Sequence, residues 1–394
     1  MTLMIETQKG LASVIERAAE TGCIAIDTEF VWEKTYYPGL GIVQIAFSKE
    51  EASIIDVLAI EDFSPFGTIL SDPGIVKILH DAQQDLTILR RATGMYPKNI
   101  FDTRLTAGFI GLSSSLSLGT LLREIINVDL AKTETRSNWL RRPLTKKQID
   151  YAVDDVRYLP AVRDELLSRV TKLGREAWVN EELAEYDNPS LYKENALEEQ
   201  FLRVKGVSKL TPKRKSVLRE LAAWREKVAR ERNCPRAWVI PDVVLVDIAQ
   251  QKPQSIPEFN SVDGLTGKAI QRYGAKMLEV VQNGLAGAVK SAPQFPKHGR
   301  DENFLNARVD MALAYLKGRS MAEEIDPALI ATRSELTALV REGADASPEN
   351  HRLLRGWRRE FIGEKLLNLL SGELVIRLDP ETGLPRSVER DRLS

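Results

Sequence analysis

The stretch 23–30, CIAIDTEF, decides the fold that this sequence predicts. Its apolar, β-branched start is typical of a buried strand, and the strand ends in Asp27, Thr28 and Glu29. Because side chains alternate along a strand, Asp27 and Glu29 are expected on one face, where two carboxylates can share a site. An Asp-x-Glu at a strand end is also a common surface feature, so its meaning depends on its neighbours.

Further strand-like runs follow at 40–48 and 52–57, with turn-like segments between them, and together they indicate a meander. Strand-like and helix-like patterns then alternate, at 75–80, 85–93, 99–103, 105–111 and 116–126. Such an order predicts an α/β domain in which a mixed sheet is flanked by helices.

Helical periodicity dominates from about residue 145 to the end, so the rest of the chain is expected to be all-α. A proline-bearing break, SAPQFPKHGR, separates two helical blocks and is typical of a linker. At 394 residues the chain is too long for one ordinary core. The expected domains are an α/β domain at 1–170, a helical connector at 171–205, a helical domain at 206–290, a linker at 291–301 and a second helical domain at 302–394.

The net charge of −1 conceals an uneven distribution of charge along the chain. Residues 201–240 hold 12 Lys and Arg against 3 acids, whereas residues 179–200 hold 7 acids against one Lys. A charge run of this kind is either a solvated helix face or a surface that follows the phosphates of a nucleic acid. Charge alone does not separate these two interpretations.

Cysteine use and hydropathy indicate a cytoplasmic protein. Cys23 and Cys234 stand far apart and form no CxxC pair, so neither a zinc site nor a disulfide framework is indicated. The first residues carry acids and lack the basic start and apolar core of a signal peptide, and no run approaches the about 20 apolar residues of a membrane span.

Three more candidate site residues lie downstream of the first strand. Asp85 begins a segment whose apolar residues would bury one helix face, and Tyr151 and Asp155 are four residues apart in a helical pattern, which places them on one face. Asp154 lies about 100° around that helix and is assigned to the exposed flank. Asp102 is better explained as the N-cap of a helix.

A cleft that gathers Asp27, Glu29, Asp85 and Asp155 is unfavourable by itself, because like charges repel and raise one another's pKa values. Divalent cations resolve this conflict, and oxygen ligands without His or thiolate suit Mg²⁺ or Mn²⁺ better than zinc. Two such ions about 3.5 to 4 Å apart can activate a water and stabilise both oxygens of a phosphodiester displacement. Tyr151 would then orient the attacking water, and its part in accepting the proton stays open.

The order of these five residues resembles that of the DEDDy exonucleases, and within them the ribonuclease D family. The resemblance extends to KTETRSNWLRRPLTKKQIDYAVDDVRYL at 132–159, where further positions match the family pattern: Lys132, Trp139, Arg142, Pro143, Leu144 and Gln148. Asn138 departs from the Asp that is common there. The helical block after residue 206 resembles the HRDC domain, and the last block looks like a second, more divergent copy.

The resemblance implies a ribonuclease H-like exonuclease domain followed by two HRDC-type domains. It implies a 3′–5′ exoribonuclease that releases nucleoside 5′-monophosphates with two divalent cations, Mg²⁺ or Mn²⁺, and that trims tRNA precursors and other RNAs with accessible 3′ ends. We expect a monomer without an organic cofactor or a membrane partner. Candidate substrate contacts are the aromatic pair Phe30 and Trp32, which could stack on bases or pack under a loop, and the motif residues Lys132, Arg142 and Gln148.

Two alternatives stay open at the level of sequence. The same four acids serve exonucleases that act on DNA, and a nuclease fold can persist as a non-catalytic RNA-binding adaptor. The intact set of five residues argues against the adaptor, because loss of function should leave substitutions at ligand positions. Other hydrolytic chemistries are poorly supplied, since the chain has three His and no GxSxG or P-loop motif. His80, at the end of a strand, is expected to be a satisfied core residue.

Overall fold

The computed structural model describes residues 3–130, 137–287 and 300–389. The chain divides into two compact units. Unit 1 comprises Met1–Glu29, Leu40–Tyr192 and His298–Ser394, and unit 2 comprises Phe30–Gly39 and Lys193–Lys297. No helix among the described residues is long and apolar enough to cross a membrane.

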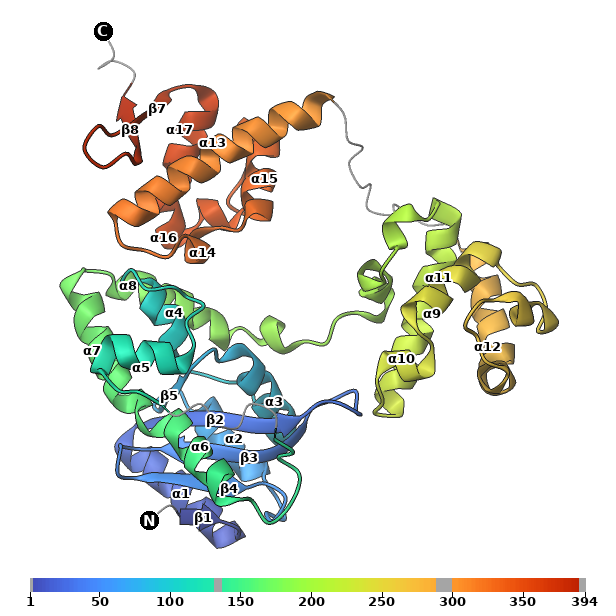
Figure 1. Cartoon of the computed structure of the whole chain (residues 1–394), viewed down its shortest axis with the longest axis horizontal. Helices are drawn as coiled ribbons and strands as arrows, with labels where there is room; N and C mark the ends of the chain where they lie inside the picture. The colour runs from blue at the N-terminus through green and yellow to red at the C-terminus, as the bar shows by residue number, and fades with distance from the viewer. Residues whose placement is uncertain (1–2, 131–136, 288–299, 390–394) are drawn as a thin grey trace. The chain divides into compact units, whose positions relative to one another are not determined.

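A mixed six-stranded sheet forms the centre of the first part of unit 1 (Figure 1). Its strands are β1 (Leu3–Ile5), β2 (Cys23–Val31), β3 (Gly39–Ala46), β4 (Ala52–Asp56), β5 (Val76–Leu79) and β6 (Ile100–Asp102), in the order β1-β4-β3-β2-β5-β6. β3 and β4 are antiparallel, whereas β2, β5 and β6 run parallel to one another. The predicted mixed sheet and its meander are confirmed, and β1 is a strand that the sequence did not predict.

Helices cover both faces of this sheet. They are α1 (Gln8–Thr21), α2 (Gly67–Ser71), α3 (Gln83–Thr93), α4 (Thr103–Gly108), α5 (Leu118–Ile126), α6 (Lys146–Arg157), α7 (Leu159–Lys172) and α8 (Glu176–Leu183). Alternation along β2 explains the two cores: Ile24 and Ile26 enter one with α1 and α3, while Ala25 enters the other with α5 and α7.

The C-terminal part of unit 1 is mostly helical and shares a core with α4, α5, α7 and α8. Its elements are α13 (Arg300–Ala322), α14 (Pro327–Ile330), α15 (Arg333–Glu342), α16 (Gly356–Arg358), α17 (Glu364–Ser371), β7 (Leu374–Leu378) and β8 (Pro385–Glu389). The rings of Phe109 and Trp357, 5.1 Å apart, join the two parts.

The expectation of helix to the end of the chain is wrong for the last segment, where β7 and β8 form an antiparallel hairpin. The turn between them depends on Asp379, whose carboxylate accepts hydrogen bonds from two backbone N–H groups, and on Gly383, which has a φ of 68°. A left-handed φ of this kind favours glycine and the reversal of a strand over a continuing helix.

Unit 2 is a helical domain that also contains the hairpin segment 30–39. Its helices are α9 (Pro212–Glu231), α10 (Arg236–Val239), α11 (Asp242–Gln251) and α12 (Gly267–Ala286), preceded by short 3₁₀ turns at Leu197–Arg203 and Val207–Lys209. The hairpin segment is held at the end of α9, where the side-chain oxygen of Asn233 accepts hydrogen bonds from the N–H groups of Tyr36 and Tyr37 at 3.1 and 3.0 Å.

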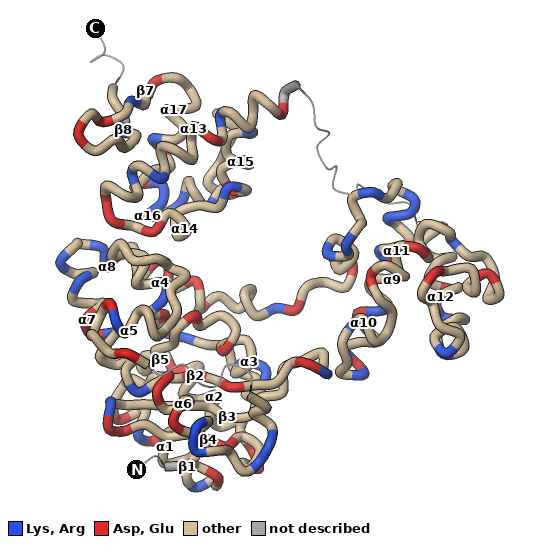
Figure 2. The backbone as a smooth tube through the Cα atoms, viewed as in Figure 1, with Lys and Arg blue, Asp and Glu red and all other residues tan. Residues whose placement is uncertain are grey.

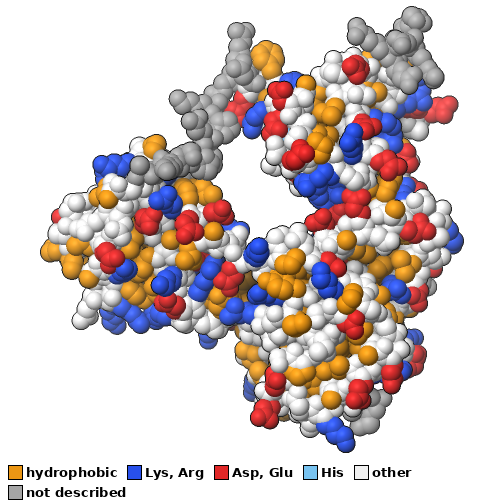
Figure 3. All heavy atoms as spheres, turned by 180° about the vertical axis from the view of Figure 1, so that it is seen from behind, with side chains coloured by type: hydrophobic (Ala, Val, Ile, Leu, Met, Phe, Trp, Pro, Cys, Tyr) orange, Lys and Arg blue, Asp and Glu red, His pale blue; other side chains and the backbone are white. Residues whose placement is uncertain are grey.

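Many cations of the basic stretch 201–240 are bound within unit 2. Arg225 pairs with Asp242 at 2.7 Å, and Arg230 and Arg236 both pair with the buried Glu226. Basic and acidic side chains are interspersed over the face of unit 2 seen in Figure 3. The sequence count therefore overstates the free positive charge, although Lys205, Lys209 and Lys213 are exposed.

Candidate active site

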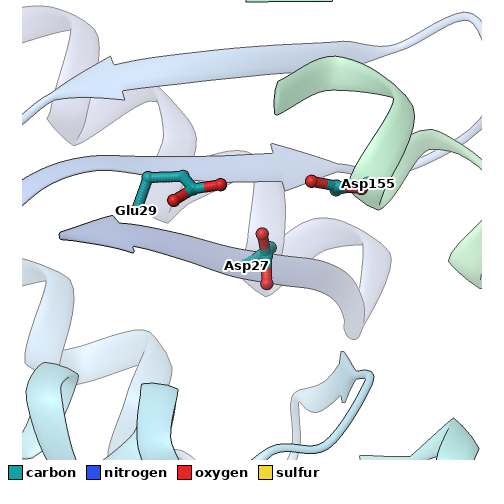
Figure 4. A group of neighbouring side chains, drawn as sticks. All are labelled: Asp27, Glu29 and Asp155. Carbon is teal, nitrogen blue, oxygen red and sulfur yellow. The ribbon is translucent and has the colours of Figure 1, made fainter. Parts of the chain in front are cut away.

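Three carboxyl groups converge beside the central sheet, from β2 and α6 (Figure 4). Asp27 and Glu29 come from β2 and Asp155 comes from α6, and one oxygen of each lies within 4.8 Å of the others. All three are only partly accessible to solvent. In Figure 2 acidic positions gather around β2 and α6. The structure thus brings together three of the four acids that the sequence singled out.

The strand and the helix position these groups for different reasons. Along β2 the buried Ile24 and Ile26 fix which face Asp27 and Glu29 occupy. Helix α6 begins at a capping box in which the Thr145 hydroxyl accepts from the N–H of Gln148, while the Gln148 side chain accepts from the N–H of Thr145. A fixed start sets the rotation of α6 and hence the direction of its later side chains.

Tyr151 and Asp155 lie on one face of α6, as their spacing predicts. The Tyr151 hydroxyl is hydrogen-bonded to the Asp155 carboxylate, and the ring of Trp139 lies 6.2 Å from the ring of Tyr151. Asp154 is half-exposed and pairs with Arg157 at 3.3 Å, so it belongs to the outer flank of the helix.

Asp85 lies in the first turn of α3 and is buried beside the three converging acids. Its carboxylate accepts a hydrogen bond from the hydroxyl of Thr28, which stands between Asp27 and Glu29 on β2. Asp85 is not one of the three groups within 4.8 Å, but its charge helps to raise the pKa values of Asp27 and Glu29. No sequence pattern marks the role of Thr28, because serine and threonine occur in strands for many reasons.

Asp102 and His80 have the structural roles that the sequence predicted. Asp102 caps α4 by accepting from the N–H groups of Arg104 and Leu105, and it also accepts from the N–H groups of Asp81 and Ala82 just before α3. The His80 ring is hydrogen-bonded to the Thr103 hydroxyl and the Leu116 carbonyl.

The converging acids hold their protons more tightly than free carboxyl groups. Burial, and then the charges of Asp85, Asp155 and Glu29, raise the pKa of Asp27 well above its usual value. Burial, and then the charges of Asp155 and Asp85, raise the pKa of Glu29 to about 8. Burial also raises the pKa of Asp85 and that of Asp155 to about 7, although hydrogen bonds from Thr28 and Tyr151 oppose the rise. Basic side chains are not among these influences in the described part of the chain.

This donor set fits divalent metal ions. It offers carboxylate oxygens alone, which hard cations such as Mg²⁺ and Mn²⁺ prefer. Neighbouring acids contribute to the raised pKa values of Asp27 and Glu29, so a cation from solution would relieve the repulsion. The arrangement can therefore hold a divalent metal ion between β2 and α6.

The structure places the predicted substrate-contact residues in different surroundings. Trp32 is 55 % exposed, and its ring N–H donates to the carbonyl of Tyr36 at 3.0 Å. The Gln148 side chain is buried in the capping box, and Arg142 pairs with Asp56 instead of pointing into solvent. Phe30 is half-buried in the same hairpin segment as Trp32, and Lys132 lies outside the described residues.

Comparison with known proteins supports the same class of enzyme. The model of the 3′-5′ exonuclease family matches residues 2–171, and the model of the HRDC domain matches residues 214–281. The fold, the converging acids and the family match together define a 3′–5′ exonuclease domain that is followed in the sequence by a helical HRDC domain.

Relatives that align with most of the chain identify one family within this class of exonucleases. Ribonuclease D of Desulfotalea psychrophila is 42% identical over 363 residues, which cover 91% of this chain and 96% of the relative. Ribonuclease D of Escherichia coli K12 is 32% identical, with 93% and 98% covered. The crystal structure of Escherichia coli RNase D, an exoribonuclease involved in structured RNA processing, has a TM-score of 0.83 at 31% identity and covers 94% of this chain and 99% of that one. The chain belongs to the ribonuclease D family and is a hydrolytic 3′–5′ exoribonuclease.

Proposed function

We propose that the enzyme releases nucleoside 5′-monophosphates from RNA 3′ ends at the site formed by Asp27, Glu29, Asp85, Tyr151 and Asp155. The observation that carries this proposal is the convergence of Asp27, Glu29 and Asp155 within 4.8 Å without a basic partner among the described residues. Asp85 would complete the ligand set from α3. When bound, two Mg²⁺ or Mn²⁺ ions would supply an activated water and stabilise the charge of the displaced oxygen.

The side chains themselves would have distinct tasks in the reaction. Asp27 and Glu29 on β2, Asp85 on α3 and Asp155 on α6 would hold the ions through their carboxylate oxygens. The Tyr151 hydroxyl, already hydrogen-bonded to Asp155, would turn toward the attacking water and align it with the terminal phosphate. Burial and the nearby carboxylates raise the pKa of Tyr151, so the phenol stays protonated in the metal-free protein.

The natural substrates would be tRNA precursors and other RNAs with a structured body and a single-stranded 3′ end. The described surface of unit 2 supports a role in binding the RNA backbone, because Lys205, Lys209 and Lys213 are exposed near the start of α9. Trp32 is exposed for stacking on a base. We propose further that the enzyme acts as a cytoplasmic monomer without an organic cofactor, and that residues 302–394 form a second HRDC-like domain.

A gel time course tests this function. The substrate is a 5′-labelled RNA with a stem and a single-stranded 3′ tail, incubated in Mg²⁺, in Mn²⁺ and in EDTA beside a DNA copy. We expect a metal-dependent ladder that shortens one nucleotide at a time on RNA, with nucleoside 5′-monophosphate as the product on thin-layer chromatography.

Other outcomes would select the alternatives. A ladder on DNA alone would place the substrate in the DNA-directed class. Binding of the RNA without hydrolysis in any divalent ion would indicate an adaptor. Asp155→Asn serves as the matched control, because loss of the ladder in this variant excludes a contaminating nuclease.

A further inference from the structure

Arg142 and Asp56 form an ion pair between the end of β4 and the segment that leads into α6. The guanidinium contacts both carboxylate oxygens, with Nε 2.5 Å from Oδ2 and Nη2 2.6 Å from Oδ1. Asp56, the last residue of β4, is 3% exposed and also accepts from the N–H of Leu58 at 3.0 Å. A bidentate pair of this kind is strong and fixes the plane of both groups.

The remaining donors of Arg142 bind backbone carbonyl groups. Nη1 donates to the carbonyls of Trp139 and Arg141 at 2.8 and 3.0 Å, and Nη2 donates to the carbonyl of Gly41 on β3 at 3.0 Å. Each nitrogen of the guanidinium therefore has a partner inside the protein. Little donor capacity is left for an RNA phosphate.

These contacts join β3 and β4 to the segment that leads into α6. Gly41 lies so close to this segment that a Cβ there would come within 2.4 Å of the Trp139 carbonyl oxygen, which shows how tightly the segment is seated. Three residues after Arg142 comes Thr145, the N-cap of α6, and Trp139 packs on Tyr151. The ion pair thus fixes the start of the helix that carries the candidate site.

We propose that Asp56 and Arg142 are positioning residues for α6, which hold Tyr151 and Asp155 in the geometry that hydrolysis needs, and that Arg142 does not contact RNA. This inference rests on the proposed roles of Tyr151 and Asp155. Errors of about 1 Å in the position of a reacting group can lower a rate about 100-fold, so an anchor remote from the metal site has a large effect on turnover. Replacing either Asp56 or Arg142 should therefore lower turnover in the same way.

The test compares Arg142→Gln, Asp56→Asn and the double variant in steady-state RNA hydrolysis. We expect each single variant to lower kcat about 10- to 100-fold with little change in KM or in RNA affinity. The double variant should lose no more than the worse single variant, because both changes remove one interaction. Arg142→Lys should recover only part of kcat, since an ammonium cannot make the two-pronged contact.

Metal binding provides a second readout. Because the pair positions Asp155, Mn²⁺ binding measured by electron paramagnetic resonance should weaken in Arg142→Gln and Asp56→Asn. The matched control is the exposed pair of Arg17 on α1 and Glu51 just before β4, joined at 2.9 Å, whose Arg17→Gln variant should keep both kcat and Mn²⁺ affinity.

Several results would overturn the inference. Weaker RNA binding in Arg142→Gln, with Asp56→Asn unaffected, would show that Arg142 contacts the substrate. A loss of activity that merely follows the unfolded fraction in thermal melts, with unchanged kcat per folded molecule, would assign the pair to stability alone. Wild-type kcat in folded Arg142→Lys and Asp56→Asn would also reject it. If Asp155→Asn retained full activity, the site itself would be wrong, and this result is independent of the ion pair.

Discussion

Unit 1 contains buried acids of two opposite kinds. At the candidate active site, Asp27, Glu29 and Asp155 gather without a basic partner in the described structure, and burial and mutual repulsion raise their pKa values. Between the exonuclease part and the C-terminal part, Glu182 is more deeply buried, at 7% exposed, yet Arg358 contacts both of its oxygens at 2.6 and 2.8 Å.

The charge of Glu182 is neutralised by arginine side chains of the fold itself. Arg352 also pairs with its carboxylate, and the ring N–H of Trp357 donates to it at 3.1 Å. Burial alone would raise the pKa of Glu182, but the hydrogen bonds and charges of Arg358 and Arg352 outweigh it and lower that pKa. The comparison teaches that a buried acid paired with arginines has a structural role. A buried group of acids without such partners is suited to bind a cation from solution.

The largest effect is expected from Asp155→Asn. Losing a metal ligand removes several kcal/mol of transition-state stabilisation, so hydrolysis should fall about 10²- to 10⁴-fold in saturating Mg²⁺. The same change removes a repelling charge, so the metal-free variant should melt at a higher temperature than wild type at pH 8. The measurements are single-turnover hydrolysis and thermal melts in EDTA. Destabilisation in EDTA would show that Asp155 is held by a partner, as Glu182 is.

Glu182→Gln should have the opposite effect on stability. Neutralising Glu182 leaves Arg358, which is 3% exposed, without its counter-charge, and breaking a buried pair from one side costs about 3–5 kcal/mol. The free energy of unfolding from a urea melt should fall by about that amount. The exposed Glu185→Gln is the control and should change stability little. An unchanged melt for Glu182→Gln would mean that water reaches Arg358 and that the contrast between the two acid groups is weak.

The pH dependence of stability sharpens the same contrast. Groups whose pKa is raised on folding stabilise the protein fully below their unfolded pKa of about 4, and this stabilisation is lost as the pH rises through the folded values. For Glu29 and Asp155 those folded values are about 8 and about 7. The metal-free protein should therefore lose at least about 1.4 kcal/mol, the equivalent of one pKa unit, between pH 5 and pH 9.

Divalent metal ions should restore the stability that the metal-free protein loses as the pH rises. Thermal melts from pH 5 to 9, in EDTA and in Mn²⁺, measure this, and the gain from Mn²⁺ should grow with pH because deprotonated carboxylates bind the ion. Asp155→Asn should show a smaller gain. A constant gain at all pH values would mean that the acids are already ionised in the metal-free protein.

Sequence patterns predicted the parts of the site that depend on periodicity. The period-2 pattern of 23–30 placed Asp27 and Glu29 together, and the spacing of Tyr151 and Asp155 placed them on one helix face, because both patterns report local geometry. The pairs Asp56–Arg142 and Glu182–Arg358 join residues 86 and 176 positions apart, and nothing local marks such partners. The sequence pattern alone therefore predicts Arg142 as a substrate contact, whereas in the structure its donors bind Asp56 and backbone carbonyl groups.

The smallest effect is expected in unit 2, at Glu226. This acid is paired with arginines, as Glu182 is, and hydrogen-bonded to a phenol, as Asp155 is. It is buried and accepts from Arg230, Arg236 and the hydroxyl of Tyr36 in the hairpin segment. Tyr36→Phe removes the hydrogen bond that the hydroxyl donates to Glu226 and those it accepts from Arg230 and Arg236. Both arginines keep their bonds to Glu226, so the net loss should stay near that of one hydrogen bond, about 0.5–1.5 kcal/mol. The hairpin should open more often while global stability changes little.

Hydrogen exchange measures this local opening, because the N–H groups of Tyr36 and Tyr37 are protected by Asn233. Exchange in peptides that cover 30–39 should speed up about 2- to 13-fold in Tyr36→Phe. Lys34→Gln, at an exposed position of the same segment, should leave exchange unchanged. Since Glu226 keeps its arginines, an effect as large as that of Glu182→Gln would show that the phenol, and not the two guanidinium groups, is what makes this buried charge tolerable.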